Sequence, residues 1–114
     1  MLPPSHYLPL SEPTFYILLS LSSSEKHGYA ILKDVEDLSG GQTRLSASTL
    51  YEALSRLLEQ GLIERVASGH DNGSRRPRKA YRLTHLGRQV LGGETSRMQR
   101  LVEKAQLRLA REQS

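Results

Sequence analysis

The segment that decides the fold is LSASTLYEALSRLLEQGLIE, residues 45–64. Its leucines recur at intervals of three and four, which is the spacing of one buried face of an α-helix. Ser46 is suited to cap the start of this helix, and Gly61 stands where a C-terminal glycine belongs. The expected buried stripe comprises Leu50, Leu54, Leu57 and Leu58. The opposite, solvent-facing side comprises Ser48, Tyr51, Glu52, Ser55, Arg56 and Glu59.

The residues that follow this helix predict a β-hairpin. Ile63–Ala67 has the character of a short strand, SGHDNGS at 68–74 is a turn-rich loop, and Arg78–Leu83 is the returning strand. Pro77 lacks a backbone N–H, so it limits how far the second strand extends toward the tip. We call the predicted hairpin, residues 63–83, the wing.

Two helices are expected before residue 45. Ser11 followed by Glu12-Pro13-Thr14 predicts a helix start, and SSSEK at 22–26 ends that helix. A second helix spans 27–41 and ends at two glycines, and Gly28 near its start would permit a close backbone approach. Residues 1–10 are expected to be irregular. The apolar residues expected to face the core are Phe15, Leu18, Leu19 and Leu21 in the first helix and Ala30, Ile31, Val35 and Leu38 in the second.

A long final helix is predicted from Thr84, which is placed to cap it. Gly92-Gly93 weakens this helix and could bend it. Its second half carries an amphipathic stripe at the spacing of a coiled-coil seam. The stripe comprises Met98, Leu101, Val102, Ala105 and Leu109. Burial against the same helix of a second copy is the favoured interpretation, and packing inside the chain on Phe15 and Leu19 is the alternative.

The order of these elements predicts an α+β, mostly helical fold: a winged helix-turn-helix with a C-terminal dimerisation helix. We expect an irregular N-terminal segment at 1–10, a winged-helix DNA-binding domain at 11–84 and a dimerisation helix at 85–114. In this arrangement the third helix enters the DNA major groove and the hairpin lies against the neighbouring backbone or minor groove. A two-fold dimer would place its recognition helices on the half-sites of a palindromic operator, about 34 Å apart.

Positive charge is concentrated around the wing. Between Arg65 and Arg88 the chain carries seven Lys or Arg and one acid, Asp71, although the net charge of the whole chain is only +4. This window, residues 65–88, is therefore +6 and the remainder is −2. Neutralising duplex phosphates releases counterions, so a local cationic cluster favours nucleic acid as a partner. A solvated surface loop is the alternative.

Composition excludes several other classes of protein. The chain has 114 residues and no cysteine, which excludes disulfides, thiolate metal sites and cysteine nucleophiles and suits a reducing cytoplasm. Its longest apolar run, FYILL at 15–19, is too short to span a bilayer, and the N-terminus lacks the pattern of a signal peptide. The four histidines have no metal-ligand spacing, and no catalytic set or phosphate-binding loop is recognisable. We therefore expect no enzyme, no cofactor, no metal and no membrane partner.

The chain resembles the PadR family of bacterial transcriptional regulators, and in particular its short subfamily. The resemblance is carried by HGYAILKDVE at 27–36, LSASTLYEALSRLLEQGLIE at 45–64 and RPRKAYRLTHLGRQVL at 76–91. It implies a dimeric winged-helix regulator, usually a repressor, and many members respond to small-molecule effectors. Some short members bind flat aromatic drugs between tryptophans at the dimer interface. This chain has no tryptophan, so that mode does not carry over.

The predicted DNA-contacting residues come from the helix, the wing and the resemblance together. By position the resemblance implies Tyr29, Thr49, Tyr51, Arg78 and Lys79. The exposed helix face adds Ser48, Ser55 and Arg56, and the charge window adds Arg75 and Arg76. Arg56 could instead pair with Glu52 or Glu59. Two other functions stay open at this point: a winged-helix module that binds only protein, and a binder of structured RNA.

Overall fold

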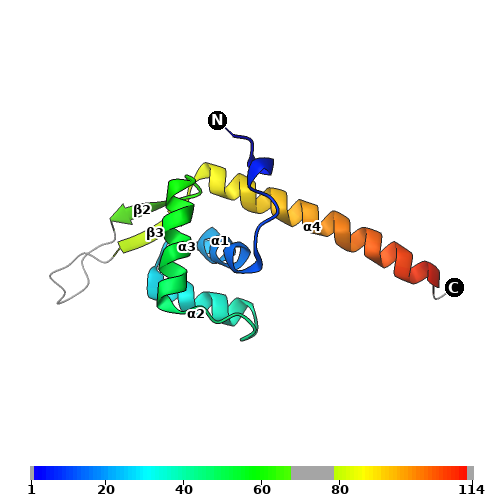
Figure 1. Cartoon of the computed structure of the whole chain (residues 1–114), viewed down its shortest axis with the longest axis horizontal. Helices are drawn as coiled ribbons and strands as arrows, with labels where there is room; N and C mark the ends of the chain where they lie inside the picture. Colours follow the sequence, from blue (N-terminus) through cyan, green and yellow to red (C-terminus); the bar gives the residue numbers. More distant parts are fainter. Residues whose placement is uncertain (1, 68–78, 113–114) are drawn as a thin grey trace.

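The computed structural model describes residues 2–67 and 79–112. Within them the chain is mostly helical with one small antiparallel sheet, as the sequence predicts (Figure 1). The elements, in chain order, are η1 (Pro4–Tyr7), α1 (Glu12–Ser23), β1 (Lys26–His27), α2 (Gly28–Leu38), α3 (Ala47–Glu59), β2 (Ile63–Ala67), β3 (Lys79–Leu83) and α4 (His85–Glu112).

The predicted caps begin and end the helices. The Ser11 and Ser46 hydroxyls accept hydrogen bonds from the backbone N–H groups of Thr14 and Thr49, three residues on in each case. Thr84 Oγ1 likewise accepts from the N–H of Gly87 at 3.0 Å, at the start of α4. α3 ends at Glu59, and Gly61, two residues beyond it, has a φ of +73°, a conformation that only glycine adopts at little cost. Local sequence therefore determines the ends of these helices.

The sheet has one strand more than the predicted hairpin. In the described part of the chain its order is β1-β3-β2, with both pairings antiparallel. β2 has the predicted bounds, and β3 covers the described part of the predicted returning strand. β1 was not predicted because two residues are too few to show an alternating pattern. It pairs Lys26 with Tyr81 and His27 with Ala80, and so ties the start of α2 to the wing.

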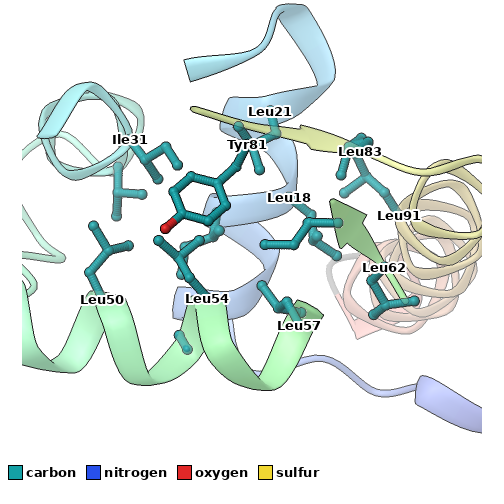
Figure 2. Packing of buried hydrophobic residues seen from close by; sticks show 14 of the residues in the cluster. Leu18, Leu21, Ile31, Leu50, Leu54, Leu57, Leu62, Tyr81, Leu83 and Leu91 are labelled. Carbon is teal, nitrogen blue, oxygen red and sulfur yellow. The ribbon is translucent and has the colours of Figure 1, made fainter. Parts of the chain in front are cut away.

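The core lies where α1, α2, α3 and the sheet meet. Leu18, Ile31 and Leu54 are almost fully buried around the ring of Tyr81, which is only 2% exposed (Figure 2). The α3 stripe is largely as predicted, with Leu50, Leu54 and Leu57 buried and Leu58 partly buried. The prediction that Ala30 and Leu38 of α2 face the core is wrong: Ala30 is exposed and Leu38 is 44% exposed. Only Ile31 and Val35 of the predicted face reach the core.

The N-terminal segment, expected to be irregular, contains η1 and is fastened to α4. The backbone N–H of Leu10 donates to Glu94 Oε2 at 2.7 Å, and the Arg97 guanidinium donates to the other carboxylate oxygen. Glu94 is 1% exposed. The hydrogen bond from Arg97, reinforced by that from Leu10 and opposed by burial, holds the pKa of the Glu94 carboxyl below its usual value.

α4 begins on the core and then leaves it. The helix continues without a break through Gly92 and Gly93 and projects well beyond the domain (Figure 1). The radius of gyration is 16.7 Å, against about 13 Å expected for a compact chain of this length. Its first turns bury Gly87, Val90 and Leu91, whereas residues 101–112 are all exposed. More than ten residues of α4 are therefore not covered by any other part of the described chain.

Candidate nucleic-acid interface

An exposed groove forms where the starts of α2, α3 and β3 come together. It is lined by His27, Gly28, Tyr29, Tyr51 and Lys79. The Tyr29 side chain is 71% exposed and that of Tyr51 is 50% exposed, which is unusual for large aromatic residues. Lys79 is exposed at the first described position of β3. The structure thus brings together three of the predicted DNA-contacting residues from three separate elements.

Gly28 makes room for the Tyr51 ring in this groove. A Cβ atom on Gly28 would lie 2.6 Å from the Tyr51 hydroxyl oxygen and 3.0 Å from Cζ, closer than real side chains approach. The absence of a side chain at Gly28 is therefore what lets the Tyr51 ring lie across the start of α2, and the close approach expected from the sequence is confirmed. Beside it, the Lys33 ammonium lies 5.7 Å from the centre of the Tyr29 ring.

His27 connects the groove to the wing. Its Nδ1 lies 3.3 Å from the carbonyl oxygen of Lys79, a contact in which the Nδ1–H tautomer donates. His27 also pairs with Ala80 across β1 and β3. It makes no side-chain cap for α2. This anchoring role was missed from the sequence because the partner lies 52 positions away.

The predicted contacts on α3 have different surroundings. The Ser46 hydroxyl lies 2.8 Å from Thr49 Oγ1 and 3.2 Å from Ser48 Oγ, so both predicted side chains belong to a hydroxyl cluster at the helix start. Ser55 is exposed at mid-helix. Arg56 is turned toward α1, where its guanidinium donates to Thr14 Oγ1 at 3.4 Å. Its side chain thus points toward a different part of the surface from the groove.

The basic window is only partly described. Within it, Arg82 donates to Glu64 Oε1 at 2.6 Å on the exposed face of the sheet, so its charge is paired inside the wing. Lys79 stands at the groove. Arg75, Arg76 and Arg78 lie outside the described residues, and their contacts stay predictions.

The predicted seam on α4 lies on a continuation of the helix face that packs on the core. At 100° per residue, the direction of Val90 and Leu91 recurs near Met98, Leu101, Val102, Ala105 and Leu109. Met98 is partly buried and Ala105 is exposed. Leu101, Val102 and Leu109 are 51%, 52% and 59% exposed. The apolar stripe is thus covered by the domain at one end and uncovered at the other.

A family model for the transcriptional regulator PadR-like family matches residues 17–93, which include the groove, the wing and the start of α4. The chain belongs to the PadR-like family. This family consists of transcriptional regulators and not of enzymes.

The chain is also similar to individual proteins, two of which are PadR regulators of known structure. An uncharacterized 37.1 kDa protein in transposon TN4556 of Streptomyces fradiae is 36% identical over 85 residues, or 75% of this chain, but the chain spans only 22% of that protein's length. A PadR family transcription regulator of Clostridium difficile is 25% identical, with a TM-score of 0.67 over 88% of this chain and 99% of the other. Bacillus subtilis PadR, solved in complex with operator DNA, is 28% identical, with a TM-score of 0.61 over 70% of this chain and 44% of the other.

These similarities identify the PadR-like fold as a winged helix with an additional C-terminal helix. Among residues 2–67 and 79–112 no cluster of histidines and acids could hold a metal ion. Over the same residues, no helix combines the length and the hydropathy that crossing a bilayer requires.

Proposed function

We propose that this chain binds double-stranded operator DNA as a homodimer and represses transcription. The observation that carries the proposal is the groove in which Tyr29, Tyr51 and Lys79 are exposed together at the first residue of β3 in the wing. Tyrosine hydroxyls and lysine ammonium groups are frequent donors to phosphate oxygens. The operator complex of the related Bacillus subtilis PadR supports DNA as the partner.

The position of the groove fits the way in which winged helices bind DNA. α3 would enter the major groove with its N-terminal half, and the wing would lie along the adjacent backbone. The groove lies beside that half of α3 and at the described end of β3, so it would meet the phosphates between the two contacts. Arg75, Arg76 and Arg78 would then place further positive charge along the DNA backbone. The net charge of +6 over residues 65–88 favours such contacts with phosphates.

Dimerisation through α4 is proposed from its uncovered stripe. Exposed Leu101, Val102 and Leu109 would lose most of their contact with water against a second copy of the helix, and each fully buried aliphatic side chain contributes about 1.5–3 kcal/mol. A two-fold pair would present two copies of α3 to a palindromic operator. In this proposal residues 11–84 bind DNA and residues 85–114 join the two copies.

Repression would follow from occupancy of the operator, because a bound dimer blocks access to the promoter. We propose that a small-molecule effector relieves it, as the family resemblance implies, and that the chain acts in the cytoplasm, where bacterial DNA is. No cofactor or metal is required for any of these steps.

The deciding experiment is an electrophoretic shift of palindromic promoter DNA over a series of salt concentrations. We expect a steep loss of affinity with salt, since each phosphate contact contributes about 0.9 to the slope of log K against log salt. Replacing both Arg78 and Lys79 with alanine should lower that slope by up to about 1.8 and weaken binding to all sequences alike. The matched control removes two exposed cations of α4, Arg100 and Lys104, and should leave the slope unchanged.

Two results would contradict the proposal. If the intact protein gives no salt-dependent shift, the chain is a protein-binding winged helix and not a DNA-binding one. If structured RNA competes as well as duplex DNA, recognition through a helix in the major groove is wrong, because the deep groove of RNA excludes a helix.

A further inference from the structure

The outer face of α3 carries acids and hydroxyl groups. Helical periodicity places Ser48, Glu52, Ser55, Arg56 and Glu59 on the side opposite the buried leucines, and all five are exposed. Arg56 is the only basic residue of α3, and its guanidinium donates to Thr14 of α1. In the described part of the chain the guanidinium of this face is therefore directed toward α1, whereas the usual contact with guanine needs a guanidinium that points into the major groove.

Glu52 is the acid of this face that lies nearer the start of the helix. It lies in the N-terminal half of the helix, next to Tyr51 of the groove, and recognition helices contact bases with their N-terminal residues. Among the described residues its carboxylate has no hydrogen-bond or ion-pair partner. Glu59, on the same face, lies about 10 Å farther along the axis at 1.5 Å per residue.

We propose that Glu52 determines operator specificity by accepting a hydrogen bond from the exocyclic N4 amino group of a cytosine in the major groove. An ionised carboxylate can only accept hydrogen bonds. Guanine presents acceptors at N7 and O6, and thymine presents an acceptor at O4, so both repel it. Adenine presents a donor at N6 but an acceptor beside it at N7, which leaves cytosine as the best match.

This role rests on the proposed binding of duplex DNA and makes it more specific. A carboxylate near the DNA lowers affinity for phosphates, so attraction must come from elsewhere in the interface, such as Lys79 and the cations of the basic window. Glu52 would then weaken binding to every sequence except those that supply the amino group. Its contribution is to the ratio between specific and non-specific affinity.

The test is selection of bound sequences from a random duplex library, followed by affinity measurements on the selected site. The wild type should show cytosine at one position of each half-site, preferred about 5- to 150-fold over the other bases. Glu52→Ala should lose that preference and retain the rest of the site. Glu52→Gln should move it toward adenine, because an amide pairs with adenine through N6 and N7. Glu59→Gln is the matched control and should leave all preferences unchanged.

The outcomes separate this inference from the proposal on which it depends. If the wild type and both Glu52 variants select the same site with the same preferences, Glu52 is not a specificity determinant although DNA binding stands. If the wild type selects no sequence at all, the proposed function fails first. Circular dichroism of each variant checks that the fold is intact. We expect an intact fold because the side chains of Glu52 and Glu59 are exposed.

Discussion

Replacing Gly87 with alanine should destabilise the protein, although alanine is the better helix former. Gly87 lies in the first turn of α4, where the helix crosses the residue that leads into β2. A Cβ there would fall well within 3.0 Å of the Leu62 carbonyl oxygen and would lie 3.3 Å from Leu83 Cδ2. That carbonyl also accepts the hydrogen bond from the Thr84 N–H at 3.1 Å, so neither backbone can move without disturbing the junction.

The magnitude follows from three opposing effects. Alanine contributes up to about 1 kcal/mol through helix propensity. Overpacking against a rigid backbone costs about 1–3 kcal/mol, and loss of the Thr84–Leu62 hydrogen bond costs about 1–3 kcal/mol. The expected net loss in free energy of unfolding is therefore about 1–5 kcal/mol.

Gly92 provides the matched control in the same helix. A Cβ at Gly92 meets nothing within 4 Å, so Gly92→Ala should raise the free energy of unfolding by about 0.5–1 kcal/mol. Urea unfolding followed by far-ultraviolet circular dichroism, at one protein concentration, compares the midpoints of the two variants with that of the wild type. Equal midpoints for the two variants, or a higher midpoint for Gly87→Ala, would refute the close contact between α4 and the start of β2.

Three further predictions concern the seam, the groove and the buried carboxylate. Leu101→Asp should turn the dimer into a monomer in sedimentation experiments, whereas Leu107→Asp, on the other side of α4, should not; a dimer in both variants would place the seam elsewhere. Gly28→Ala should displace the Tyr51 ring and weaken DNA binding, with little loss of stability, because the atoms that a Cβ would meet belong to the exposed end of a side chain that can move aside. In a double-mutant cycle Tyr51→Ala should remove most of the effect of Gly28→Ala on DNA binding, and additive effects would argue against the contact. Glu94→Gln should destabilise by about 1–3 kcal/mol at neutral pH. Because folding lowers the Glu94 pKa, its contribution is complete above the pKa of the unfolded chain's carboxyl and is lost as pH falls through the lower folded value, so wild type and variant should converge in acid.

Local patterns were sufficient to predict most of the fold. The leucine spacing of residues 45–64 and the hydroxyl caps Ser46 and Thr84 depend on neighbours within one helical turn, and β2 depends on an adjacent turn-rich loop. The family resemblance selected Tyr29 and Tyr51, which helix periodicity by itself leaves as ordinary surface residues. The sequence does carry a signal for Glu94, which is an acid on the apolar stripe between Leu91 and Met98.

What the sequence determined by itself is the order and type of the main elements and the concentration of charge around the wing, because these follow from short-range spacing and composition. Tertiary structure alone decided that β1 joins the sheet, that Arg56 turns toward α1, that Gly28 makes room for the Tyr51 ring, and that Glu94 receives the N-terminal segment. Each of these depends on a partner more than twenty residues away, whose approach no local pattern encodes.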